Sequence, residues 1–179
     1  MHEIILPETK PALEWVNGRA LQKMSPRRKH GLAQSRFVAA LDSWAQTQDC
    51  GTVATEWEFR IAPPGEVRRP LVPDVAYLSY AQIPLDRIDE ADIPRVAPDA
   101  VVEVISPGDR MRDIEEKTRV YLASGTSVIF LVDTDSQTVT ARDAAASVVF
   151  GIDDTVGHRS LPGFSMPARR LFEMRFGRR

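Results

Sequence analysis

The fold class is predicted mainly from two stretches, "VPDVAYLSY" (72–80) and "APDAVVEVISPGDRMRDIEEKTRVYLASGTSVIFLVD" (97–133). Both contain apolar runs of strand length, and the second also contains a charged segment with helical spacing. They predict strands over 71–79, 99–105 and 127–133, and a helix from about 109 to 124. Since a helix that connects two neighbouring strands makes them parallel, we expect 99–105 and 127–133 to be parallel and central.

The rest of the chain predicts further elements of a mixed sheet. These are a hairpin over 13–26 that turns at Asn17-Gly18, an amphipathic helix over 26–51, a half-exposed strand over 52–62, an antiparallel edge over 138–150 and a short helix over 167–174. The predicted fold class is α/β (α+β), with a mixed central sheet flanked by helices and an N-terminal hairpin. We expect residues 1–179 to form a single domain.

The composition is that of an ordinary globular protein, with 43% hydrophobic and 27% charged residues and a net charge of -2. The single cysteine, Cys50, excludes an internal disulfide framework and a zinc site made of several thiolates. No apolar run approaches the length of a membrane span, and no signal-peptide core is visible. We therefore expect a cytoplasmic protein without membrane contact.

Two carboxylates interrupt the apolar runs. Glu103 stands among Val102, Val104 and Ile105 in a strand that is expected to be buried on both faces, and Asp74 follows Pro73 in the neighbouring run. Taken alone, Asp74 could close a turn and Glu103 could pair with an arginine. Taken together, two close carboxylates repel unless a cation lies between them, which favours a site for a hard divalent ion.

The predicted helix adds a lysine to this region. Asp113 and Lys117 are four residues apart, a spacing that most often forms a solvated surface pair. Lys117 is also spaced to continue into the apolar face at Val120 and Tyr121. If that face packs on strand 99–105, the Lys117 amine can reach Glu103.

These segments resemble the Uma2 (Uma-two) family of restriction-endonuclease-like proteins, within the PD-(D/E)XK nuclease superfamily. The resemblance covers "EWVNGRALQKMSP", "PDVAYLS", the block from Pro98 to Asp133, and "LPGFSMPARRLF", in that order. It implies a restriction-endonuclease-like core and hydrolysis of phosphodiester bonds in nucleic acid, with DNA as the expected substrate. It also implies Mg²⁺ or Mn²⁺ as the cofactor.

The resemblance implies roles for particular residues. Asp74, Glu103 and the backbone carbonyl of Val104 would bind the metal ion, and Asp74, Glu103 and Lys117 would be catalytic. The superfamily pattern places a lysine where this chain has Ile105, and Lys117 is the expected substitute.

Further residues are candidates for the pocket and for nucleic-acid contact. Glu14, His30, Glu56 and Asp113 are the supporting candidates, although His30 could be a surface or capping residue and Glu56 a solvent-facing partner of Arg60. The candidates for phosphate contact are Arg27, Arg28, Lys29, Arg110 and Arg112, any of which could be ordinary solvated surface.

Three alternatives stay open at this point. The chain could be a catalytically weak member that binds nucleic acid or protein, a hydrolase of small phosphoesters, or a structural domain. For a nuclease that cuts both strands of a duplex, a homodimer is expected.

Overall fold

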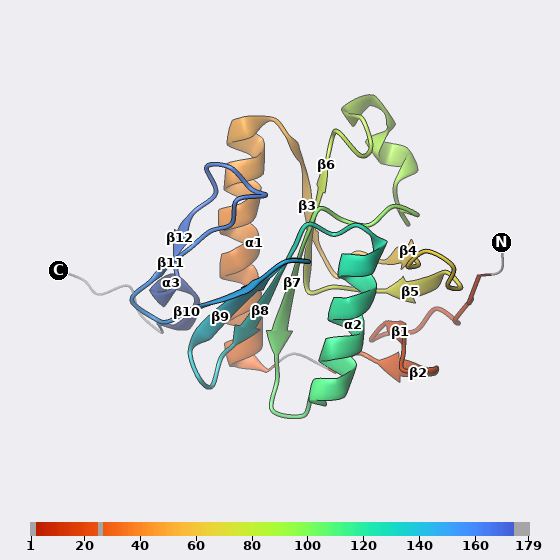
Figure 1. Ribbon diagram of the computed structural model, residues 1–179, viewed down its shortest axis with the longest axis horizontal. Helices are drawn as coiled ribbons and strands as arrows, with labels where there is room; N and C mark the ends of the chain where they lie inside the picture. Colours follow the sequence, from red (N-terminus) through yellow and green to blue (C-terminus); the bar gives the residue numbers. More distant parts are fainter. Residues whose placement is uncertain (1–2, 25–26, 174–179) are drawn as a thin grey trace.

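The computed structural model describes residues 3–24 and 27–173, so Pro26 and Met174, at the outer ends of two predicted helices, lie outside the described residues. The elements, arranged as in Figure 1, are β1 (Leu13–Val16), β2 (Arg19–Gln22), α1 (Arg28–Gln48), β3 (Gly51–Thr55), β4 (Phe59–Ile61), β5 (Arg69–Leu71), β6 (Val75–Ser79), a 3-10 helix η1 (Leu85–Glu90), β7 (Ala100–Ile105), α2 (Met111–Ser124), β8 (Val128–Asp133), β9 (Thr138–Arg142), β10 (Ser147–Phe150), β11 (Thr155–Val156), β12 (Met166–Pro167) and α3 (Arg169–Phe172).

The main sheet has the strand order β10–β9–β8–β7–β6–β3. Strands β7 and β8 are parallel and are connected through α2, with Ala100 paired to Val128 at the start of their register. The other neighbouring strands described in this sheet pair antiparallel. The predicted central crossover is therefore confirmed, as is the predicted class of a mixed sheet flanked by helices. The predicted hairpin is also present, because β1 and β2 pair antiparallel around Asn17-Gly18.

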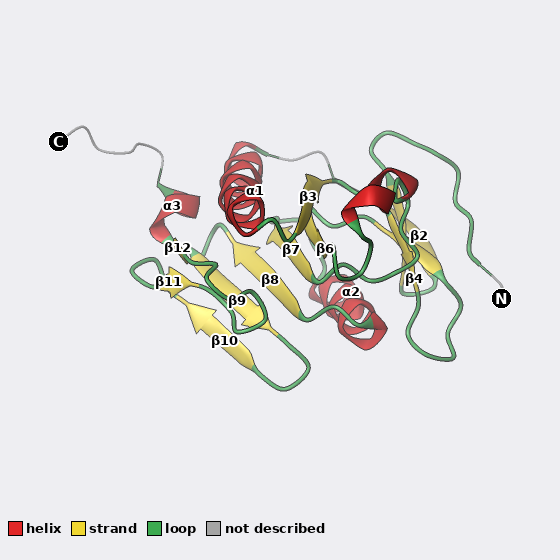
Figure 2. Cartoon of the chain, turned by 90° about the horizontal axis from the view of Figure 1, so that it is seen from above, coloured by secondary structure: helices red, strands yellow, loops and turns green. Residues whose placement is uncertain are grey.

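Helices α1 and α2 cover opposite faces of the sheet (Figure 2). On one face, Val102 of β7 belongs to a buried cluster with Phe37 of α1. On the other face, Val101 of β7 belongs to a second cluster with Tyr121 of α2. This double burial explains the unbroken apolar run of β7. Because side chains alternate along a strand, Glu103 lies on the same face as Val101, the face that α2 covers.

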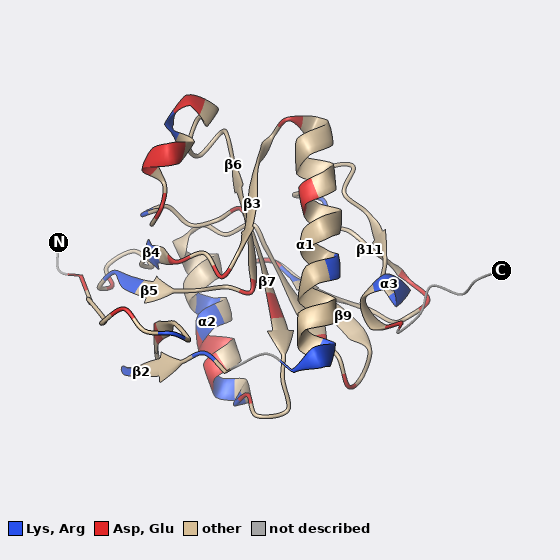
Figure 3. Ribbon diagram, turned by 180° about the vertical axis from the view of Figure 1, so that it is seen from behind, with Lys and Arg blue, Asp and Glu red and all other residues tan. Residues whose placement is uncertain are grey.

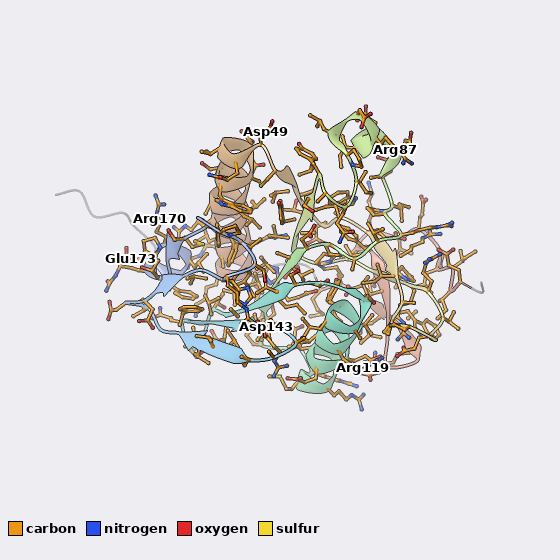
Figure 4. All side chains as sticks on the ribbon, turned by 45° about the horizontal axis from the view of Figure 1, so that its top comes forward. Asp49, Arg87, Arg119, Asp143, Arg170 and Glu173 are labelled. Carbon is orange, nitrogen blue, oxygen red and sulfur yellow. The ribbon has the colours of Figure 1, made fainter. Side chains whose placement is uncertain are left out.

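Helix α1 buries one narrow stripe. Its buried side chains are Ala33, Phe37, Leu41 and Ala45, whereas the apolar side chains of Leu32, Ala40 and Trp44 are only partly buried. The helix ends before Asp49, which has a left-handed φ of 47° and lies at the far end of α1 (Figure 4). None of the helices in the described ranges is long and apolar enough to cross a membrane.

The prediction of one continuous strand over 52–62 is wrong. The chain forms β3 and β4 there, and the two strands belong to different sheets. Between them, Glu56 has a φ of 50°, in the left-handed region that interrupts an extended strand.

The predicted strand over 71–79 is likewise divided, into β5 and β6, by Val72, Pro73 and Asp74. Pro73 has no N–H group that could donate to a neighbouring strand. Backbone groups of Val72 and Asp74 form hydrogen bonds with side chains instead. The N–H of Val72 donates to Glu14 Oε1 (2.8 Å), and the carbonyl oxygen of Asp74 accepts a hydrogen bond from Gln34 Nε2 (2.9 Å). This break therefore links the sheet to polar side chains of β1 and α1.

Candidate active site

A pocket of about 610 Å³ lies at the carboxyl end of β7, and its walls come from hairpin β1–β2 and from the first turns of α1 and α2. In Figure 1 the start of α1, the arrowhead of β7 and the start of α2 lie toward the same lower side of the molecule. Nine of the residues singled out in the sequence line this pocket: Glu14, His30, Glu56, Asp74, Glu103, Val104, Arg110, Asp113 and Lys117.

Lys117 joins two acids from distant parts of the chain, the buried Glu14 and the half-buried Glu103. Its Nζ lies 2.6 Å from Glu103 Oε1 and 2.9 Å from Glu14 Oε1. The side chains are 10%, 14% and 4% exposed for Lys117, Glu103 and Glu14. Glu14 is itself held by the N–H of Val72. The lysine of α2 therefore reaches the acid of β7, as its position on the helix face suggested.

Asp74 is held on both of its carboxylate oxygens. Oδ1 accepts a hydrogen bond from Lys23 Nζ (2.8 Å), and Oδ2 accepts one from the N–H of Val104 (2.7 Å). His30 Nε2 lies 3.5 Å from Oδ2, and its Nδ1 is 3.0 Å from Ser106 Oγ. His30 is thus a neighbour of Asp74 inside the pocket and not a surface residue of α1.

Glu56 also faces the pocket. Its Oε2 lies 3.1 Å from Lys23 Nζ, and its Oε1 accepts a hydrogen bond from Gln34 Nε2 (3.1 Å). The alternative that Glu56 is the partner of Arg60 is wrong, because Arg60 pairs with Glu58 (2.9 Å) and Glu3 (3.4 Å).

Asp113 lines the pocket but is bonded to the hairpin. Its Oδ1 accepts from Asn17 Nδ2 (2.7 Å) and its Oδ2 from Arg19 (2.6 Å). The i,i+4 pairing of Asp113 with Lys117 is therefore not what the structure shows. Asp113 instead connects the first turn of α2 to the turn of the hairpin.

The pKa values follow from burial and from an excess of acids over bases. Burial raises the pKa of Glu103 to about 7, and Asp74 and Glu14 add to this effect against the attraction of Lys117. Burial alone would lower the pKa of Lys117, but Glu103, Glu14 and Asp74 raise it above its usual value. Burial and the neighbouring acids therefore raise the pKa of Glu103, and three acids raise the pKa of Lys117.

Asp74 shifts in the opposite direction. Burial would raise its pKa, but the hydrogen bond from His30 and the charge of Lys23 hold the pKa of this carboxyl well below its usual range. Asp74 is therefore ionised at neutral pH, whereas the pKa of Glu103 lies near neutral pH. Two carboxyl groups with such different pKa values are typical of a functional site.

The oxygen donors of the pocket suit a hard divalent cation in kind. Among residues 3–24 and 27–173, however, no group of three or more His, Cys, Asp or Glu side chains is arranged to hold a metal ion. Ammonium groups lie between the acids instead, Lys117 between Glu14 and Glu103, and Lys23 between Asp74 and Glu56. A metal ion at this place would share its oxygens with these lysines.

The candidates for phosphate contact lie at the starts of two helices. Figure 3 shows basic segments at the start of α1 and along α2, on the two sides of β7. Their side chains are exposed, at the start of α1 for Arg27, Arg28 and Lys29 and at the start of α2 for Arg110 and Arg112. Lys29 pairs with the exposed Asp135 (3.1 Å), and Arg110 lines the pocket.

Three residues of this site were not predicted from the sequence. Lys23, Gln34 and Ser106 contact predicted site residues directly. Lys23 lies one residue beyond β2, and its contacts to Asp74 and Glu56 join segments that are far apart in the chain. The contacts of Gln34 and Ser106 depend on the packing of α1 against β7, which no local pattern encodes.

The comparisons with known proteins agree with this architecture. The model of the Uma2 family, described as "Putative restriction endonuclease", matches residues 2–169. The chain belongs to the Uma2 family. This Uma2 chain is also similar to a crystal structure from Anabaena variabilis, whose description is "putative nuclease belonging to DUF820", with a TM-score of 0.81, 29% identity and 93% of each chain covered. No curated protein matches the chain.

Proposed function

We propose that this pocket hydrolyses phosphodiester bonds of nucleic acid, with DNA as the expected substrate, and that the chain is a PD-(D/E)XK-type nuclease. The observation that carries the proposal is that Asp74, Glu103 and Lys117 line one pocket at the end of β7. Asp74 directly precedes Val75, and Glu103 directly follows Val102, the residue that pairs with Val75. A chain of the Uma2 family with this arrangement has two acids and a lysine of the kinds that metal-assisted hydrolysis uses.

The charge of the pocket supports a metal cofactor. A phosphodiester is an anion, yet the described lining has six carboxylates against four lysines and arginines. The acids are Glu14, Glu56, Asp74, Glu103, Asp109 and Asp113, and the bases are Arg19, Lys23, Arg110 and Lys117. A divalent cation would remove the repulsion between these acids and a phosphate.

We propose Mg²⁺ or Mn²⁺ as that cation, held by Asp74, Glu103 and the carbonyl of Val104. Such an ion lowers the pKa of a bound water and polarises the phosphate. The remaining chemistry belongs to the chain. Lys117 orients the attacking water and balances the negative charge that grows in the transition state.

Other side chains keep the proposed catalytic groups in place. Glu14 and Glu103 together hold the amine of Lys117, and Val104 N–H and His30 hold one oxygen of Asp74. Groups that are held before the substrate arrives need not reorganise during the reaction.

The substrate would be held through its phosphates. The basic residues at the starts of α1 and α2 (Arg27, Arg28, Lys29, Arg110 and Arg112) flank the pocket and provide charge without base recognition. For cleavage of both strands we propose that two copies of the chain act as a homodimer.

The test is hydrolysis by the metal-loaded protein. Supercoiled plasmid, single-stranded DNA, RNA and bis(p-nitrophenyl) phosphate are incubated with Mg²⁺ or Mn²⁺, and an EDTA arm serves as the blank. We expect metal-dependent cleavage of DNA that falls by about 100-fold or more in Glu103→Gln. Glu115→Gln is the matched control, because Glu115 lies on α2 and pairs with Arg142 (2.7 Å) at the surface.

Three results would contradict parts of this proposal. If no condition gives cleavage, or if Glu103→Gln cleaves as well as the unchanged protein, the pocket is not a nuclease centre. Turnover of bis(p-nitrophenyl) phosphate alone would instead identify a hydrolase of small phosphoesters.

A further inference from the structure

The amine of Lys23 lies inside a cage of three oxygens. Its Nζ is 2.8 Å from Asp74 Oδ1, 2.8 Å from the carbonyl oxygen of Val72 and 3.1 Å from Glu56 Oε2. The Lys23 side chain is only 11% exposed. Two carboxylates and one backbone carbonyl are the donors that hard divalent cations use in proteins. The cage therefore has the chemistry of a metal site but holds an ammonium group.

The oxygens of the cage come from two separate segments. Val72 and Asp74 flank Pro73 in the break between β5 and β6, and Glu56 follows the last residue of β3. Gln34 of α1 connects them, because its amide donates to Glu56 Oε1 (3.1 Å) and to the carbonyl oxygen of Asp74 (2.9 Å). The cage thus has supports besides Lys23 and can persist without that side chain.

Asp74 is shared between this cage and the proposed metal site. Its Oδ1 faces Lys23, whereas its Oδ2 faces Val104 and His30 in β7 and α1. In two-metal nucleases the ions lie about 3.5–4 Å apart and act on both sides of the reacting phosphate. A carboxylate that directs one oxygen toward each ion is suited to such a pair. At Asp74, the position next to Oδ1 is occupied by the amine of Lys23.

We propose that Lys23 takes the place of a second divalent ion, so that the site binds one metal ion per chain. The inference rests on the proposed function, because it assumes that the first ion binds at Asp74 and Glu103. The three N–H bonds of an ammonium group match the three oxygens of the cage in number. A fixed positive charge at this point would attract a phosphate without a second metal ion.

The experiment counts bound ions without using activity. Metal-free protein is titrated with Mn²⁺, and free Mn²⁺ is followed by electron paramagnetic resonance. We expect one Mn²⁺ per chain for the unchanged protein and for Lys23→Arg, and two for Lys23→Ala, in which the cage is open. Lys29→Ala is the matched control and should bind one, because Lys29 is exposed and pairs with Asp135.

A second variant tests the cage itself. In Lys23→Ala combined with Glu56→Gln, the open cage loses one charged oxygen, so we expect the second Mn²⁺ to be lost and the first to remain. Circular dichroism and thermal melting establish that each variant is folded. If Lys23→Ala does not fold, Lys23→Gln serves in its place.

The outcomes separate this inference from the proposed function. Two Mn²⁺ per chain in the unchanged protein would overturn the inference but leave a metal-dependent nuclease. One Mn²⁺ in both the unchanged protein and folded Lys23→Ala would also overturn it. No Mn²⁺ binding, together with no cleavage, would overturn both proposals.

Discussion

At the scale of single residues, the environment of Glu103 indicates that its cluster of charged side chains is functional and not only structural. A buried ion pair contributes little to stability when desolvation is counted, and unpaired excess charge costs free energy. Glu103, Glu14 and Asp74 share two lysines, Lys117 and Lys23, so the cluster has more acids than nearby amines. Such an excess is expected where a protein trades stability for binding or catalysis.

The pH dependence of stability tests this interpretation of Glu103. Its folded pKa of about 7 lies above its usual value of 4.5. The stability contributed by the protonated form is therefore fully present below about pH 4.5 and is lost as the pH rises through about 7. Glu103→Gln lacks this loss. In metal-free buffer we expect its melting temperature to rise relative to the unchanged protein between pH 5 and pH 8.

The opposite result would identify a structural ion pair. In that case, Glu103→Gln would have a lower melting temperature than the unchanged protein, and the difference would be larger at pH 8 than at pH 5. The charge of Glu103 would then stabilise the fold through Lys117.

The sequence alone could locate part of this residue cluster. Glu103 and Asp74 stood out because each interrupts an apolar run, and Lys117 because of its place on the helix face. Lys23 did not stand out, because a lysine near the end of a hairpin is ordinary and its contacts to Asp74 and Glu56 join segments far apart in the chain.

At the scale of elements, the breaks in the predicted strands contribute more to the candidate site than the strands themselves. The alternation over 52–62 predicts one strand, since its side chains fit the pattern, but the backbone turns at Glu56. The break at Pro73 divides the second predicted strand, and the groups freed there bind Glu14, Lys23 and Gln34. Alternation reports which side chains are buried and does not report where the backbone changes sheet.

The start of β3 offers a second test at this scale. A Cβ atom added at Gly51 would lie 2.4 Å from the carbonyl oxygen of Leu78, which belongs to the paired strand β6. We expect Gly51→Ala to lower the free energy of unfolding by about 1–3 kcal/mol, as overpacking typically does. Urea denaturation followed by circular dichroism measures this change.

Gly31 supplies the matched control for Gly51. It lies in α1, and a Cβ atom there would meet nothing within 4 Å. Gly31→Ala should raise the free energy of unfolding by about 0.5–1 kcal/mol, because alanine is the better helix former. Equal effects of the two substitutions would contradict the close packing of β3 on β6.

At the scale of the whole molecule, the hairpin β1–β2 closes the pocket against the sheet and α2. It carries Glu14 into the cluster and is bonded to α2 through Asp113, which is 6% exposed. The hairpin, the central crossover and the mixed sheet could all be predicted from local patterns. Which helix end the hairpin contacts could not, because that contact joins residues almost a hundred positions apart. That residues 1–179 form one domain stays a prediction.

Removal of the Asp113 carboxylate should loosen the hairpin. In Asp113→Ala the hydrogen bonds to Asn17 and Arg19 are lost, and we expect a cost of about 1.5–3 kcal/mol with faster amide exchange in β1 and β2. Hydrogen exchange followed by mass spectrometry localises the effect. Arg112→Ala is the control, since the Arg112 side chain is exposed and its Nε lies 3.9 Å from Asp113 Oδ1. If amide exchange in β1 and β2 is as slow in Asp113→Ala as in Arg112→Ala, Asp113 does not hold the hairpin in place.

Cleavage by two matched variants tests whether Asp74 belongs to the catalytic site. The chain contains the dipeptide Pro-Asp at Asp74 and again at Asp99, but Asp99 accepts a hydrogen bond from Ser79 N–H (2.7 Å) just before β7, at the end opposite to the pocket. With Mg²⁺ or Mn²⁺ and duplex DNA, we expect Asp74→Asn to lose cleavage by about 100-fold or more while Asp99→Asn retains it. Equal cleavage by folded Asp74→Asn and the unchanged protein would contradict the assignment of this pocket as the catalytic site.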